Sequence, residues 1–245
     1  MNKNQKLLIL SAFLVMALGY FVPNLFNPDR GFIATCLLAG AQEILMFGVP
    51  ALLLLKGLGE SKESVKSIVR APDPYTAGLS LLSSVAYVLS AVIIASVTYV
   101  MLEGLGIKPV IPEPFTPEAL PELLVALVMS ALIPAICEET FFRYALPMLF
   151  ERKLSRRHSV LLSSLIFSAL HLSLVAVPML MVMSLLMHRV FDRHKNLILL
   201  FIFHGMYNFS VLLFNYTKAE PGFSAALLSI AVFVIATKFL LREEA

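Results

Sequence analysis

Eight apolar runs divide the sequence, and most of them are long enough to cross a membrane. They lie near residues 7–22, 32–55, 77–102, 122–150, 159–176, 178–191, 197–214 and 223–241. A helix that crosses the hydrocarbon core of ~30 Å needs roughly 17 to 25 residues. The sixth run is short, so 159–191 could also form one bent hairpin that does not cross fully. The runs predict an all-α fold, a polytopic transmembrane helical bundle of about eight helices.

The composition supports this fold class. Only 14% of the residues are charged, whereas soluble domains carry about 25%. Charges so few cannot cover a water-facing surface, so lipid must contact much of the protein. No second domain, internal repeat or low-complexity tail is evident, and residues 1–245 are predicted to form a single integral membrane domain.

The positions of the basic residues predict the topology. If the N-terminus is inside, the inner segments hold fifteen of the 19 Lys and Arg residues, the outer segments hold three, and Arg143 lies within the membrane. Inner loops of membrane proteins carry an excess of Lys and Arg. Both termini are therefore predicted to be cytoplasmic. The first run is interpreted as a retained anchor, although Lys3 and Lys6 ahead of it also resemble the start of a signal peptide.

Three charged residues interrupt the fourth run, namely Glu138, Glu139 and Arg143. A charge at the centre of a membrane helix costs about 2.5–3.5 kcal/mol on insertion scales. Such residues usually face a protein interior or a wet cavity and mark functional sites. Glu139 and Arg143 are four residues apart, a spacing that pairs them on one helix face. Glu138 is then freer to meet another helix.

Two further runs carry matching polar residues. His171 follows Phe167 by four residues in the fifth run, and Asn208 follows His204 by four residues in the seventh. Each pair should therefore share one helix face. Glu138, His171 and Asn208 each lie about twelve residues from the expected inner boundary, roughly 18 Å at 1.5 Å per residue. His204 comes out near 12 Å on the same scale. These helices are expected to form one site.

This set of residues resembles the three signature motifs of the CPBP (Abi) family, the type II CAAX prenyl proteases, which are intramembrane endopeptidases. The resemblance covers about residues 120–214, the expected catalytic core. The motifs are Glu138-Glu139-x-x-x-Arg143, Phe167-x-x-x-His171 and His204-x-x-x-Asn208.

The resemblance implies a glutamate-type peptidase. Glu138 would activate a water molecule with His171 beside it, and His204 and Asn208 would bind the oxyanion of the tetrahedral intermediate. No Ser or Cys occupies a signature position, which disfavours an acyl-enzyme intermediate.

The remaining motif residues would act indirectly. Glu139 and Arg143 would orient Glu138, and they could also contact the substrate. The expected partners are membrane lipids and a peptide or protein substrate, which could itself be lipidated, but no nucleic acid. The protein is expected to be multi-pass, with an active site reached from the cytoplasmic half and no cofactor.

Other interpretations remain open. Glu138, His171 and His204 could instead ligate zinc, although the sequence lacks the His-Glu-x-x-His arrangement of zinc peptidases. A transporter-like protein or a non-catalytic bacteriocin-immunity protein is a second class, and only peptide-bond cleavage separates it from an enzyme. Glu43, a carboxylate in the second run, could line the same cavity or pair with a polar neighbour, and the structural role is the favoured interpretation.

Overall fold

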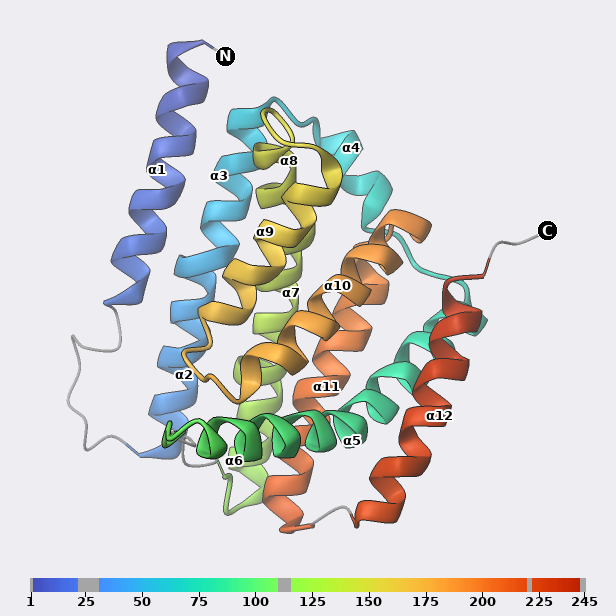
Figure 1. Ribbon diagram of the computed structural model, residues 1–245. Coiled ribbons are helices and arrows are strands. Elements are labelled where there is room, and N and C mark those ends of the chain that lie inside the picture. Colours follow the sequence, from blue (N-terminus) through green and yellow to red (C-terminus); the bar gives the residue numbers. More distant parts are fainter. Residues whose placement is uncertain (1, 22–30, 110–115, 220–221, 243–245) are drawn as a thin grey trace.

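The computed structural model describes residues 2–21, 31–109, 116–219 and 222–242. It confirms the all-α prediction, because every regular element in these ranges is a helix (Figure 1). Nine continuous helices are present in the described ranges. They are α1 (Lys3–Tyr20), Phe32–Leu58, α4 (Lys62–Ile68), α5 (Pro74–Gly104), Leu120–Phe150, α9 (Arg156–Ala169), α10 (Ala176–His194), α11 (Leu197–Thr217) and α12 (Phe223–Leu240).

Two of the long helices contain wide π-helical turns. The helix Phe32–Leu58 consists of α2 (Phe32–Glu43), a π turn at Ile44–Gly48 and α3 (Val49–Leu58). The helix Leu120–Phe150 comprises α6 (Leu120–Ala126), a π turn at Leu127–Leu132, α7 (Ile133–Glu139), a π turn at Thr140–Ala145 and α8 (Leu146–Phe150). Such turns often occur at functional sites, because they change which way the following side chains point.

Five helices are long and apolar enough to cross a membrane, compared with about eight predicted. Within the described ranges they are Phe32–Leu58, Pro74–Gly104, Leu120–Phe150, Leu197–Thr217 and Phe223–Leu240. These five indicate a multi-pass integral membrane protein. The predicted runs 7–22, 159–176 and 178–191 correspond to α1, α9 and α10. Helix α9 has only 14 residues, whereas α1 and α10 have 18 and 19 residues but are less apolar than the five.

The chain between 159 and 191 forms a helical hairpin of α9 and α10, and neither helix is among the five that are long and apolar enough to cross a membrane. Helix α9 has 14 residues, about 21 Å at 1.5 Å per residue, which is shorter than the ~30 Å core. It ends at Ala169, and the chain turns before α10 begins at Ala176. The turn contains Leu172 at φ 52°, a left-handed conformation that breaks a helix. The apolar sequence therefore concealed a turn inside the fifth predicted run.

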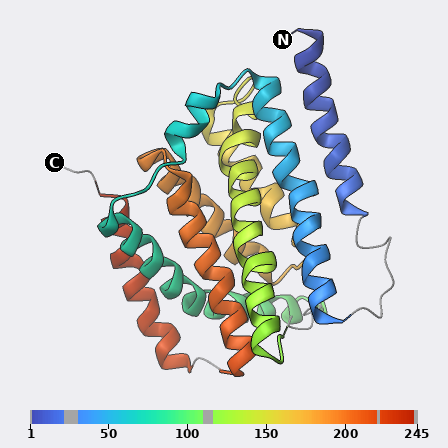
Figure 2. The ribbon, with the colours of Figure 1, turned by 180° about the vertical axis from the view of Figure 1, so that it is seen from behind.

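The helix Leu120–Phe150 lies between α2–α3 on one side and α11 on the other (Figure 2). Helix α11 is also joined to α5 by two serine hydroxyls. Ser80 Oγ donates to the Leu199 carbonyl at 2.8 Å, and Ser84 Oγ donates to the Phe203 carbonyl at 2.6 Å. Hydrogen bonds of this kind hold helices together in lipid, where apolar packing has no preference for protein over lipid tails.

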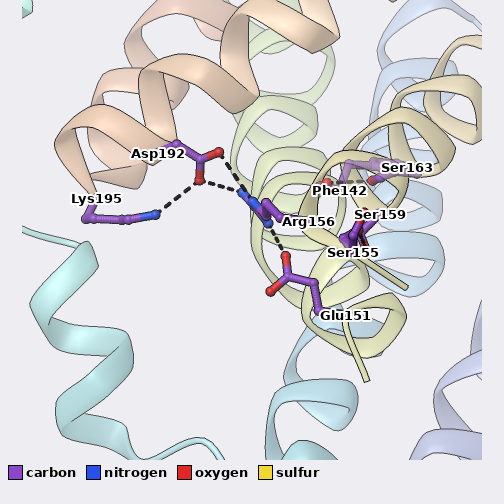
Figure 3. A network of polar contacts seen from close by, with 8 residues as sticks. All are labelled: Phe142, Glu151, Ser155, Arg156, Ser159, Ser163, Asp192 and Lys195. Atoms are coloured by element: carbon purple, nitrogen blue, oxygen red, sulfur yellow. Dashed lines mark hydrogen bonds and ion pairs between the residues drawn. The ribbon is translucent and has the colours of Figure 1, made fainter. Parts of the chain in front are cut away.

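Polar contacts join α9 to α10 and join α9 to the helix Leu120–Phe150. Arg156 at the start of α9 pairs with Asp192 of α10 at 2.6 Å and with Glu151 at 2.5 Å (Figure 3). About two turns further along α9, Ser163 Oγ donates to the Phe142 carbonyl at 2.6 Å. These contacts set the position of the far end of α9, where Phe167 and the turn lie.

Candidate active site

Glu138 and Glu139 end α7, and Arg143 lies in the π turn that follows. Glu139 and Arg143 are both fully buried. Arg143 Nε lies 2.8 Å from Glu139 Oε2, and Arg143 Nη2 donates to Glu139 Oε1 at 3.2 Å. The pairing predicted from their spacing is confirmed, and it supplies the guanidinium with its counter-charge inside the bundle.

Glu139 also contacts α11, which the sequence did not predict. His204 Nδ1 lies 2.7 Å from Glu139 Oε1, whereas His204 Nε2 lies 3.8 Å from Glu138 Oε2. An ionised carboxylate can only accept a hydrogen bond, so Nδ1 is the donor to Glu139. Glu138 was expected to be the freer of the two to meet another helix, and in the structure both carboxylates lie near His204, Glu139 the nearer. Glu139 holds the imidazole ring, and this leaves Nε2 directed toward Glu138.

Phe167 of α9 lies at the centre of the site. Its ring centroid is 4.4 Å from Arg143 Cζ, 5.0 Å from the His171 ring centroid and 6.2 Å from that of His204. A guanidinium over an aromatic face is attracted by the electrons of the ring. The sequence flagged Phe167 only by its spacing from His171. In the structure it is the apolar surface against which a cation and two imidazoles are placed.

The sequence predicted that His171 lies within a helix, but in the structure it lies in the turn after α9. Its Nδ1 lies 2.9 Å from the Phe167 carbonyl oxygen. A carbonyl accepts hydrogen bonds, so Nδ1 carries the proton and neutral His171 presents a lone pair at Nε2. The hydrogen bond to the Phe167 carbonyl, in the last turn of α9, thus orients the imidazole of His171.

A cavity of about 270 Å³ adjoins these residues. Glu138 and His171 line it together with Glu43, Gln42, Phe142 and Phe167. The cavity therefore brings the end of α2, the end of α7 and the turn after α9 to one space. It is large enough for several water molecules or part of a peptide.

Asn208 is the one predicted site residue that the structure does not join to the others. It follows His204 by one turn of α11 and is half-buried. No direct hydrogen bond links it to another residue in the part of the chain that the structure describes, and neither Asn208 nor His204 lines the cavity. Its amide stays available to a ligand.

Glu43 lines the same cavity as Glu138, which is one of the two placements that the sequence left open. The signal in the sequence was a carboxylate inside an apolar run, which marks a functional candidate by itself.

Among the described residues, no group of three or more His, Cys, Asp or Glu side chains is arranged to hold a metal ion. Glu138, His171 and His204 thus remain a zinc set only if the side chains rearrange.

Comparisons with known proteins give one match. Residues 120–210 match the family model described as Rce1-like, type II CAAX prenyl endopeptidase Rce1-like. The matched segment contains Glu138, Glu139, Arg143, Phe167, His171, His204 and Asn208. No curated protein and no solved structure matches the chain.

Proposed function

Because residues 120–210 belong to the Rce1-like family of type II CAAX prenyl endopeptidases, we propose that this protein is an intramembrane endopeptidase. It hydrolyses a peptide bond of a membrane-associated substrate. The observation that carries the proposal is the buried cluster of Glu138, Glu139 and His204, in which two helices contribute acid and imidazole groups beside a cavity.

Glu138 is the general base in this proposal. It lines the cavity, is buried to 7% exposure, and its Oε2 has no hydrogen-bond partner among the described residues. A base must reach the proton it abstracts directly or through one water. Glu138 removes a proton from a cavity water as the oxygen attacks the peptide carbonyl. His171, on the same cavity with its Nε2 free, shares the proton transfers.

His204 stabilises the oxyanion. Glu139 accepts the Nδ1 hydrogen bond of the ring, and this contact orients the imidazole that binds the oxyanion. Asn208, one turn away, adds its amide once the substrate is bound. Donors placed in this way where charge develops are worth about 3–4 kcal/mol each.

Glu139 and Arg143 are positioning residues. Their ion pair is fully buried, and Glu139 transmits the position of the pair to His204 through the 2.7 Å contact. The matching family model is described as a type II CAAX prenyl endopeptidase, which supports a peptide or protein substrate. We infer that the substrate is a peptide with or without an attached lipid, and that it reaches the cavity from the cytoplasmic half.

The test is cleavage by the purified protein in lipid vesicles. The probes are a fluorogenic farnesylated peptide that ends in a CAAX sequence and the same peptide without the lipid. We expect the wild type to cleave at least one of them. Glu138→Gln keeps the size of the side chain but removes the base, so turnover should fall by about 10²–10⁴-fold with an unchanged melting temperature. Full activity in Glu138→Gln, or no cleavage of either peptide by the wild type, would overturn the proposal.

A further inference from the structure

Glu43 ends α2 and faces the active-site cavity from a helix outside the family segment. Its carboxyl group lines the same space as Glu138 and His171. The Oε2 atoms of Glu43 and Glu138 are both buried, and neither has a hydrogen-bond partner among the described residues. Both glutamates thus line one cavity, and each has one buried carboxyl oxygen without a hydrogen-bond partner among the described residues.

The packing of α2 shows that this arrangement depends on close helix contact. A Cβ atom at Gly48 would lie 3.0 Å from Cys137 Sγ, and one at Gly40 would lie 2.7 Å from Met129 Sδ. Gly40 and Gly48 flank Glu43, and Cys137 directly precedes Glu138. The two glycines therefore let the backbone beside Glu43 approach the helix that carries Glu138.

The two carboxylate segments share a local geometry. A π-helical turn begins directly after Glu43, at Ile44, and another begins directly after Glu139, at Thr140. Turns of this kind are rare, and many occur at functional sites. Both helices thus change their winding at the level of the cavity.

Glu60 shows how this chain pairs a structural glutamate. Its Oε2 accepts hydrogen bonds from Tyr144 Oη at 2.8 Å and from Ser64 Oγ at 2.6 Å. Burying a carboxyl oxygen without a partner is unfavourable. Glu60 Oε2 avoids this cost, whereas Glu43 Oε2 has no hydrogen-bond partner among the described residues. A ligand in the cavity is the donor that Glu43 lacks, and water is the small donor that can serve two carboxyl groups at once.

We propose that Glu43 is a second carboxyl group of the catalytic centre, which holds the attacking water against Glu138. The inference rests on the proposed peptidase function. One O–H of the water points to Glu43 and the other to Glu138. The water oxygen forms a bond with the carbonyl carbon, and the carbonyl π electrons move to the carbonyl oxygen. At the same time the O–H bond that points to Glu138 breaks, and Glu138 takes the proton.

The remaining steps leave Glu43 unchanged. The hydroxyl group of the tetrahedral intermediate keeps its hydrogen bond to Glu43. When the oxyanion re-forms the C=O double bond, the C–N bond breaks, and the proton held by Glu138 moves to the leaving amine nitrogen. Glu43 therefore orients the nucleophile, while Glu138 transfers the proton.

The test compares Glu43→Gln with the matched change Glu60→Gln. The amide that Glu43→Gln introduces keeps the size of the side chain but removes a carboxylate acceptor, so kcat should fall by about 10²-fold while KM changes by less than about twofold. Glu60→Gln should keep kcat, because its carboxylate serves only Tyr144 and Ser64. An unchanged kcat in folded Glu43→Gln, or a raised KM with kcat retained, would remove Glu43 from the catalytic centre.

Thermal stability gives a readout that does not depend on activity. Removal of an unpartnered buried carboxyl group should keep or raise the melting temperature of Glu43→Gln, whereas Glu60→Gln should lower it. A lower melting temperature for Glu43→Gln would show that Glu43 is paired and would overturn the inference. If the wild type cleaves no peptide, the proposed function fails, and the melting temperatures still decide whether Glu43 is paired.

Glu43→Asp provides a second variant for the case in which Glu43→Gln does not fold. The shorter side chain keeps the charge but withdraws the carboxyl group by one methylene. We expect a fall in kcat of at least about tenfold with KM retained, because misplacement of a reacting group by about 1 Å is costly. Wild-type kcat in Glu43→Asp would contradict the proposed contact with the water.

Discussion

Glu139 Oε1 lies 2.7 Å from His204 Nδ1, so a residue paired with Arg143 on its own helix also fixes the imidazole of α11. Within the site, this contact is the shortest polar link between the helix Leu120–Phe150 and α11. Glu139 therefore has two partners, and the loss of its charge should have two separable effects.

The first effect concerns stability. Glu139→Gln leaves Arg143 buried without its counter-charge, and breaking a buried pair in this way costs roughly 3–5 kcal/mol. Arg143→Gln removes the other half of the pair. Both variants should therefore have a lower melting temperature in detergent than the wild type, by similar amounts. The double variant should be less damaging than the two losses added, because the residues contact each other. Strictly additive losses would contradict a direct pairing.

The second effect concerns turnover. Arg143→Gln retains the carboxylate that holds His204, whereas Glu139→Gln does not. At equal folded fractions, Glu139→Gln should therefore lower kcat at least about tenfold more than Arg143→Gln does, since misplacing a catalytic group by about 1 Å can cost 10²-fold. Cleavage assays normalised to folded protein measure this difference. Equal kcat values would show that the Glu139–His204 contact has no part in catalysis.

The charge distribution predicts which loops face the cytoplasm. In a background without Cys36 and Cys137, single cysteines at the exposed positions Lys62, Lys153 and Lys108 can be labelled with an impermeant maleimide in intact cells. We expect Lys108→Cys to react at once and the other two only after permeabilisation, because basic loops stay inside. Reaction of Lys153→Cys in intact cells would invert the topology and place the cavity opening on the other side.

The chemistry proposed above uses no metal. Purified active protein should contain substoichiometric zinc and should keep its activity in a strong chelator. Catalytic zinc is usually held by three protein ligands, and side-chain movement would be needed for Glu138, His171 and His204 to form such a set. One zinc per chain, lost together with activity and abolished by His171→Ala, would establish the zinc alternative.

The sequence predicted the parts of the site that depend on local geometry. The pairing of Glu139 with Arg143 follows from helix spacing alone. The contact of Glu139 with His204 depends on how two helices pack, which no spacing within one helix encodes. The preference of His204 for Glu139 over Glu138 was therefore missed.

The length of the helices was less predictable than their presence. Hydropathy measures the extent of an apolar run, and the run 159–176 has no Gly or Pro to mark a break. The chain nevertheless turns after Ala169, with Leu172 in a left-handed conformation. His171 therefore lies in a turn, and α9, with 14 residues, is not among the helices that are long and apolar enough to cross a membrane.

The two serines of α5 determine the register of the catalytic helix α11. Ser80 and Ser84 bind the carbonyls of Leu199 and Phe203, and each hydroxyl reaches a residue 119 positions ahead. A slip of α11 by one residue would move it by 1.5 Å and turn it by 100°, which would carry His204 away from Glu139. Apolar side chains oppose such a slip only weakly, because lipid tails are as apolar as the neighbouring helix. The alignment of acid and imidazole thus depends on hydroxyl groups on a helix that contributes no catalytic residue.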